Sequence, residues 1–162
     1  MIAALEIDRI VAEYRARRTE WEPLLPRRRM GYTRSRLVAC DAYEVLALLW
    51  LPGALTPIHD HGDSYCATHV LAGELNVARY LRTDGGTDAS TSALRLVGRG
   101  VQRAGDGDAL GSARELHSVE NLAPEDALSL HVYAPRYTTF GIYDESGLRI
   151  ALAPSRYDAV LG

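Results

Sequence analysis

The spacing of apolar residues changes once along the chain, near residue 30, and this change constrains the fold more than any other feature. Before it, apolar residues recur at three- and four-residue steps, which predicts an amphipathic helix over residues 2–18, ended by Pro23 and Pro26. The apolar positions are Ile7, Ile10, Val11 and Tyr14. After it come only short runs rich in Val, Leu and Tyr, separated by turn residues. The pattern predicts a mainly all-β protein, with a leading helix and about eight to ten short strands in a sandwich or small barrel.

No second long helical pattern follows, which argues against βαβ units and a parallel sheet. The expected strands cover residues 36–40, 43–51, 66–71, 74–81, 93–97 and 127–133, with two more near 140–143 and 148–152. Residues 84–92 form the most loop-like stretch. With 162 residues, no internal repeat and no linker, we expect one domain over residues 1–162, its barrel spanning about 30–155.

Charge and composition exclude several classes of partner. The net charge of −3 provides no basic face for nucleic acid. The longest apolar run covers residues 45–51, far short of the ~20 residues that span a bilayer. Charged residues Glu6, Asp8 and Arg9 stand where a signal peptide keeps an apolar core. Two cysteines, Cys40 and Cys66, can form only one bridge, so we expect a cytoplasmic protein, and a monomer.

Histidine is the residue type that points to chemistry. Among five histidines, His59 and His61 stand two apart, so in an extended strand both side chains point to one face. Imidazole is the commonest metal ligand. By itself such a pair indicates a metal site and surface histidines about equally well.

The residues around this pair resemble the two motifs of the cupin superfamily. Gly53, His59, His61, Cys66 and Gly73 have the spacing of the first motif, with the cysteine where a glutamate ligand normally stands. Residues 117–121 are similar to the end of the second motif, which begins with a histidine and ends with an asparagine. The resemblance implies a cupin β-barrel in which His59, His61 and His117 bind one metal ion.

Within that superfamily, the chain resembles the cysteine dioxygenases (type I) and related thiol dioxygenases. The matching stretches are residues 32–34, 50, 59–66, 116–121 and 129–135, in family order. One departure is Tyr65, which stands where the family commonly has a histidine. The resemblance implies a non-haem Fe²⁺ enzyme that uses O₂ to oxidise a small thiol, most simply L-cysteine to cysteine sulfinate.

The charge of such a site agrees with thiol chemistry. Non-haem iron sites typically combine two histidines with one carboxylate. Three neutral imidazoles would leave Fe²⁺ with its full charge of +2, which a substrate thiolate lowers to +1. The remaining positive charge favours thiolate binding, and coordination deprotonates the thiol despite its free pKa of about 8.5.

The resemblance also assigns the residues that bind substrate. It implies that Arg34, with Tyr32 beside it, binds the substrate carboxylate, for which the planar guanidinium is well suited. The residues alone favour a surface arginine at the start of a strand, and the resemblance reverses that preference.

Ser129, His131 and Tyr133 alternate at period two and therefore share one strand face. Inside a barrel, they would form a hydrogen-bonded chain in which serine sets the histidine tautomer and histidine positions the tyrosine hydroxyl. An outward polar face over Leu128 and Leu130 is the alternative. By resemblance, Cys66 and Tyr133 form a thioether cross-link; the alternative is a buried free cysteine.

Other functions remain open at this point. Dioxygenases of 3-mercaptopropionate usually lack the cysteine and place their arginine elsewhere, so Cys66 and Arg34 favour cysteine as substrate. A zinc hydrolase is suggested by His59-x-His61-x-Asp63, but Ser64 replaces the histidine that its motif needs next. A non-enzymatic metal-binding cupin, such as a small-molecule sensor, is the third alternative. His69 is interpreted as structural or surface-exposed and Cys40 as a core residue.

Overall fold

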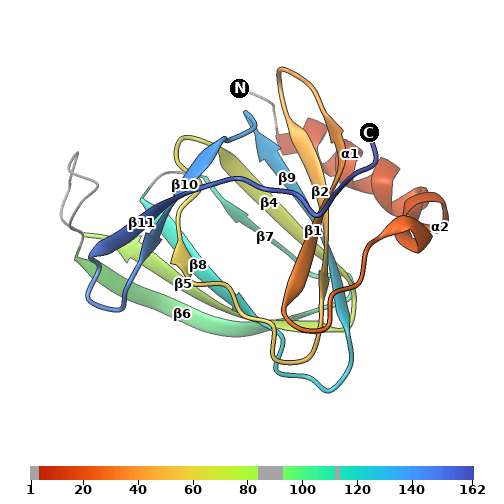
Figure 1. Ribbon diagram of the computed structural model, residues 1–162. Helices are drawn as coiled ribbons and strands as arrows, with labels where there is room; N and C mark the ends of the chain where they lie inside the picture. The colour runs from red at the N-terminus through yellow and green to blue at the C-terminus, as the bar shows by residue number, and fades with distance from the viewer. Residues whose placement is uncertain (1–3, 84–92, 112–113) are drawn as a thin grey trace.

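The computed structural model describes residues 4–83, 93–111 and 114–162 (Figure 1). Two helices, α1 (Ala4–Ala16) and α2 (Arg18–Trp21), and the 3₁₀ turn η1 (Glu22–Leu24) precede the strands. The predicted leading helix over residues 2–18 is confirmed in its central part, and it ends at about the expected place. The loop expected at residues 84–92 lies outside the described residues.

Within the described residues, twelve strands form two six-stranded sheets. The first sheet has the order β12-β1-β2-β9-β4-β7, and the second has the order β11-β10-β3-β8-β5-β6. The strands of the first sheet are β1 (Tyr32–Ala39), β2 (Glu44–Trp50), β4 (Tyr65–Ala72), β7 (Gly107–Leu110), β9 (Ala127–Ala134) and β12 (Ala159–Val160). Those of the second are β3 (Ile58–His59), β5 (Glu74–Arg82), β6 (Leu94–Arg103), β8 (Glu115–Glu120), β10 (Thr139–Tyr143) and β11 (Arg149–Pro154).

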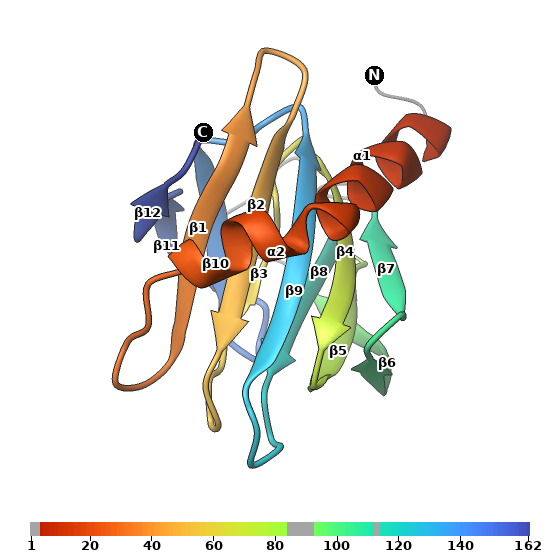
Figure 2. The same cartoon turned by 90° about the vertical axis from the view of Figure 1, so that its right-hand side faces the viewer.

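The central strands β2 and β9 of the first sheet are buried on both faces because helix α1 covers the outer side of this sheet (Figure 2). Every residue of the central strand β9 is buried. Leu128, Leu130 and Val132 pack in one cluster with Ile7 and Ile10 of the helix. The intervening residues of β9 therefore face the interior between the two sheets. The alternative of an outward polar face on this strand is wrong.

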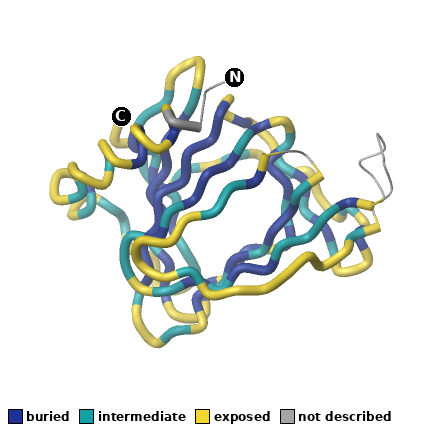
Figure 3. Tube along the Cα trace, turned by 180° about the vertical axis from the view of Figure 1, so that it is seen from behind, coloured by how far each residue is buried: buried dark blue, intermediate teal, exposed yellow. Residues whose placement is uncertain are grey.

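The second sheet lacks such a cover over much of its outer face. Strand β6 is exposed along nearly its whole length, in contrast to the buried strands across the core (Figure 3). Cys40, interpreted above as a core residue, is in fact exposed in the turn between β1 and β2, so that interpretation is wrong. No helix within the described residues is long and apolar enough to cross a membrane.

The two glycines of the first motif occupy turns that need them. Gly53 and Gly73 have φ of 77° and 70°, a region that L side chains rarely adopt. A Cβ at Gly73 would also lie 2.6 Å from the carbonyl oxygen of Asp126. This close approach lets β4 turn directly into β5, so that one strand continues into the opposite sheet.

Candidate functional site

Three histidines meet at one point of the second sheet. His59 ends β3 and lies directly opposite His117 of β8 in the strand register, and His61 follows two residues after His59. One ring nitrogen from each lies within 4.8 Å of the others. The ring centroids are 4.7–5.0 Å apart. The structure thus brings together the three residues that the sequence singled out.

The free ring nitrogens fit a metal ion. His59 Nδ1 is 2.9 Å from the Pro57 carbonyl oxygen and must donate to it, which leaves Nε2 as an unprotonated lone-pair donor. His61 Nε2 is buried and has no hydrogen-bond partner among the described residues. Burying a polar atom without a partner is costly, and a metal bound at this point would remove that cost.

Asp60 stands between two of these histidines in the sequence but points away from the group. Its carboxylate accepts hydrogen bonds from the backbone N–H groups of Gly62 and Gly141, both at 3.0 Å, and from the Tyr143 hydroxyl at 2.7 Å. These bonds fix the loop that carries His61. Among the described residues, the group of potential ligands therefore holds no carboxylate.

Burial keeps the three imidazoles neutral. It lowers the pKa of His59, and it lowers the pKa values of His61 and His117 well below the ordinary value, with the neighbouring imidazoles adding to the effect. The neutral ring is the form that coordinates a metal. The donor set is thus three uncharged nitrogens, as expected from the sequence.

A hydrogen-bonded chain faces this group from β9 of the first sheet. Trp50 Nε1 donates to Ser129 Oγ at 2.8 Å, Ser129 Oγ lies 2.9 Å from His131 Nε2, and His131 Nδ1 lies 3.2 Å from the Tyr133 hydroxyl. An indole can only donate, so the serine proton is left for Nε2 and the His131 proton sits on Nδ1. The Tyr133 oxygen then accepts, and its own proton is left for the Tyr137 hydroxyl or for a ligand in the cavity.

Cys66 and Tyr133 lie opposite one another on β4 and β9. Both are buried, and Cys66 is a free thiol in this structure. Burial raises the pKa of the Cys66 thiol and holds the pKa of Tyr133 well above its usual value. The cysteine thus occupies the position of the missing glutamate ligand, but it lies beside the tyrosine and outside the histidine group.

Arg34 enters the same cavity from β1. Its Nη2 donates to the Tyr137 hydroxyl at 2.8 Å, and Tyr32, two residues earlier on the strand, stacks on Trp50 with ring centroids 4.7 Å apart. Arg34, His59 and His117 line one cavity of about 30 Å³, which has room for only a small ligand. Its lining is Tyr32, Arg34, Leu48, Trp50, Thr56, Pro57, His59, His117, Val119, His131, Tyr133, Tyr137 and Phe140.

Sequence reasoning missed Tyr137 and Phe140. Tyr137 lies in the connection between β9 and β10, and Phe140 is the second residue of β10; their ring centroids are 5.9 Å apart, and both rings contact the histidine group. Their signal was weak, because aromatic residues just after a strand are common in cores. Only the position of Tyr137, four residues beyond Tyr133, hinted at a place beside the site.

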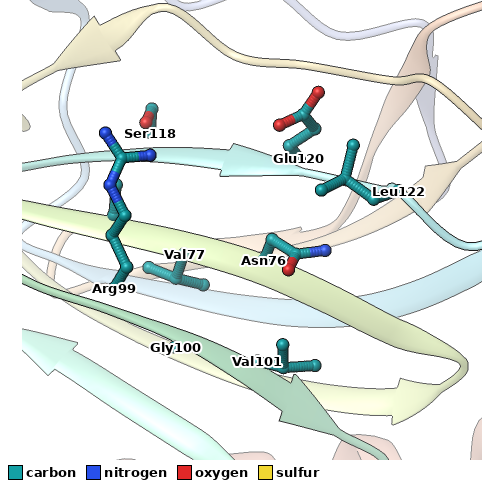
Figure 4. Close-up of a pocket in the computed structure, with 9 residues that line it drawn as sticks. Asn76, Val77, Arg99, Gly100, Val101, Ser118, Glu120 and Leu122 are labelled. Carbon is teal, nitrogen blue, oxygen red and sulfur yellow. The ribbon is translucent and has the colours of Figure 1, made fainter.

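A larger hollow of about 410 Å³ lies on the outer face of the second sheet (Figure 4). Asn76, Arg99, Ser118 and Glu120 contribute its polar side chains. No histidine or cysteine lines it, and its arginine is exposed. The chemistry predicted from the sequence belongs to the small interior cavity between the sheets.

Comparisons of structure agree with the predicted fold. A Klebsiella pneumoniae protein with a double-stranded β-helix domain superposes with a TM-score of 0.56 at 19% identity, covering 76% of this chain and 94% of that one. The Schizosaccharomyces pombe Cnp3 cupin domain gives 0.54 at 10% identity, covering 70% and 66%. The cupin fold expected from the sequence is thereby confirmed.

Comparisons of sequence are more specific. The family model for cysteine dioxygenase type I matches residues 1–146. Human cysteine dioxygenase type 1 is 30% identical over 142 residues, which cover 86% of this chain and 69% of the human protein. The zebrafish (Danio rerio) protein of the same name is 25% identical over the same shares. On these grounds, the chain belongs to the cysteine dioxygenase type I family.

Proposed function

We propose that this protein is an Fe²⁺-dependent thiol dioxygenase that converts L-cysteine to cysteine sulfinate, with His59, His61 and His117 as the iron ligands. The observation that carries the proposal is one small cavity that is lined by Arg34 and by His59 and His117, with His61 grouped beside these two histidines. A ligand that spans them needs a metal-binding group at one end and an anion at the other. Cysteine has a thiol on one carbon and an amine on the next, which together can chelate a metal ion, and the carbon that bears the amine also carries the carboxylate.

Iron at this point would supply the Lewis acid that binds and deprotonates the thiol and brings O₂ to it. In the overall reaction, R–SH and O₂ give R–SO₂H. Sulfur loses four electrons, O₂ gains four, and both oxygen atoms end on sulfur. No external reductant is needed, so the chain has only to bind and orient its two substrates.

Substrate binding would depend on Arg34, with Tyr32 beside it. The guanidinium can hold a carboxylate through two parallel hydrogen bonds. Its Nη2 group donates to the hydroxyl of Tyr137, which lines the same cavity. Burial of this charge pair away from bulk water would make the interaction strong.

Tyr133 would orient the reacting groups. The chain from Trp50 through Ser129 and His131 leaves its hydroxyl proton available to donate toward the metal point. Burial keeps this tyrosine protonated, since its pKa is well above the usual value. We assign it the task of donating a hydrogen bond to substrate or O₂, with His131 and Ser129 holding it in place.

Cys66 and Tyr133 would also form the thioether cross-link. Their opposition in adjacent strands places the thiol next to the ring that it would join. Forming the C–S bond removes two protons and two electrons, which O₂ would accept. Peptide mapping after exposure to iron, O₂ and cysteine should reveal a linked fraction, and only free Cys66 would refute the cross-link.

The activity is tested by oxygen-electrode kinetics of the iron-loaded protein with L-cysteine, 3-mercaptopropionate and cysteamine side by side. We expect L-cysteine to give the highest kcat/KM, because it alone offers both the amine and the carboxylate. Preference for 3-mercaptopropionate would change the substrate but keep the reaction. Metal binding without oxygen uptake on any thiol would favour a non-enzymatic cupin, and activity only with zinc would favour a hydrolase.

A further inference from the structure

The last eight residues of the chain, 155–162, lie along β1, the strand that carries Arg34 (Figure 2). They fall beyond residue 146, where the match to the family model ends. Strand β12 pairs in parallel with β1, with Ser35 opposite Ala159 and Arg36 opposite Val160. The segment thus occupies the edge of the first sheet closest to the guanidinium.

This segment forms hydrogen bonds with both backbone groups of Arg34, its N–H and its carbonyl oxygen. The Arg34 N–H donates to Asp158 Oδ2 at 2.8 Å, and the Asp158 N–H donates to the Arg34 carbonyl oxygen at 2.7 Å. Asp158 also forms an ion pair with Arg28. One residue of the segment therefore fixes where the arginine side chain begins.

The same segment contacts the guanidinium itself. Arg34 Nη2 donates to Ser155 Oγ at 3.3 Å, in addition to its bond with Tyr137. The Tyr157 ring centroid lies 5.9 Å from Arg34 Cζ, as does that of Tyr137. Aromatic rings at this distance attract a cation. Two groups from the C-terminal segment therefore act on the end of the side chain.

Tyr157 is in turn anchored in the core. Its hydroxyl donates to Glu44 Oε2 at 2.6 Å. Glu44 is fully buried on β2, and its other carboxylate oxygen has no hydrogen-bond partner among the described residues. A buried carboxylate needs a nearby positive charge, and the charge of Glu44 interacts with that of Arg34. This interaction offsets part of the cost of burying the Glu44 carboxylate.

We propose that residues 155–158 are part of the substrate-carboxylate site, with Ser155 and Tyr157 as positioning residues that hold the Arg34 guanidinium and Glu44 as the buried anchor of Tyr157. The inference rests on the proposed role of Arg34 as the carboxylate-binding residue. An arginine side chain loses much rotamer freedom when it binds, and contacts that fix it beforehand reduce that loss. The segment thereby favours thiols that carry a carboxylate over those that do not.

The test uses the full-length, iron-loaded protein carrying Ser155→Ala and Tyr157→Phe together, which removes both hydroxyls and keeps the ring. Equilibrium binding of L-cysteine and of cysteamine is measured by calorimetry without O₂. We expect L-cysteine to bind roughly three- to tenfold more weakly than to the wild type, with cysteamine unchanged. Ser155→Thr combined with Tyr157→Phe returns a hydroxyl at position 155 only, and it should restore part of the affinity lost in the double variant.

Tyr14→Phe is the matched control, since Tyr14 lies on helix α1, outside the site. It should leave the binding of both ligands unchanged. Equal weakening of L-cysteine and cysteamine, or unchanged L-cysteine binding in the double variant, overturns the inference. If the wild type consumes no O₂ but still binds L-cysteine more tightly than the double variant does, the proposed oxidation fails while this assignment stands. A wild type that binds no thiol carboxylate overturns both.

Discussion

The two walls of the interior cavity are built in different ways. The metal wall, from the second sheet, consists of His59, His61 and His117. His59 ends the short strand β3, His61 follows it, and His117 lies on the paired strand β8. The opposite wall, from the first sheet, consists of Arg34 on β1 and the polar face of β9. The hydroxyls of Tyr137 and Ser155, which lie outside these two strands, contact Arg34. The metal wall is uncharged, whereas the opposite wall carries the half-buried cation of Arg34, and the buried carboxylate of Glu44 lies on the neighbouring strand β2.

The outer faces of the two sheets differ in how far they are covered. Helix α1 covers the first sheet, while strand β6 leaves much of the second sheet exposed. A rigid, doubly buried sheet suits the residues that must select and orient a substrate. A metal ion would itself hold its three ligands together, so the metal wall needs less support from packing. The predictions below test this division of labour.

Removing one ligand should have the largest effect. His117→Ala leaves two imidazoles, and we expect iron affinity and oxygen uptake to fall ~100-fold or more. Metal content after gel filtration, together with oxygen-electrode rates, measures both. His69→Ala is the matched control because this histidine stands apart from the group and should leave both values unchanged. Full iron retention by His117→Ala would remove His117 from the ligand set.

Removing the cation of the opposite wall should have the second-largest effect. Arg34→Ala should cost ~2–5 kcal/mol in kcat/KM for L-cysteine, because it takes one partner from a buried charge pair. Iron content should stay as in the wild type, since Arg34 acts from the other sheet. Arg99→Ala, an exposed arginine of the outer face, is the control. An equal loss with cysteamine, which has no carboxylate, would contradict the assignment.

Breaking the chain on β9 should weaken the first sheet itself. Ser129→Ala leaves the buried Trp50 N–H and His131 Nε2 without their shared partner, which should cost about 1–3 kcal/mol in the free energy of unfolding. Urea unfolding of the metal-free protein measures this cost. Ser118→Ala, a half-buried serine of the second sheet, should cost much less. Equal costs for the two serines would argue that the chain adds nothing to ordinary burial.

Acid should destabilise the metal-free protein through the same chain. Burial lowers the pKa of His131 to about 3, whereas the unfolded chain has the ordinary value near 6.5. The unfolded state therefore binds more protons between these values, and stability is full above pH ~6.5 and falls as the pH drops toward 3. His131→Asn should reduce this slope by about 1.4 kcal/mol per pH unit. An unchanged slope would mean that this histidine is not buried in its neutral form.

The metal wall was the easier one to predict from the sequence. His59 and His61 lie two apart, and an extended backbone points both to one face, although the strand itself ends at His59 and a loop carries His61. The pairing of His59 with His117 could not follow from local pattern, because β3 is only two residues long and exists through its partners β8 and β10. That ligand came from the family resemblance, as did the placement of Arg34.

The C-terminal support of the opposite wall could not be predicted. Ser155 and Tyr157 reach Arg34 across more than a hundred residues of sequence, and no spacing rule connects such distant segments. The burial of Glu44 could not be predicted either, because a charged residue at the start of a strand normally faces solvent. Cys40 was misplaced because a lone cysteine is often buried, and the β1–β2 turn exposes it.

The proposed reaction transfers both atoms of O₂ to a thiol held between the two walls. The most direct measurement is mass spectrometry of the product formed from L-cysteine under ¹⁸O₂ by the iron-loaded protein. We expect cysteine sulfinate that carries two labelled oxygen atoms. Unlabelled sulfinate, or cystine as the sole product at the full rate of oxygen uptake, would contradict it.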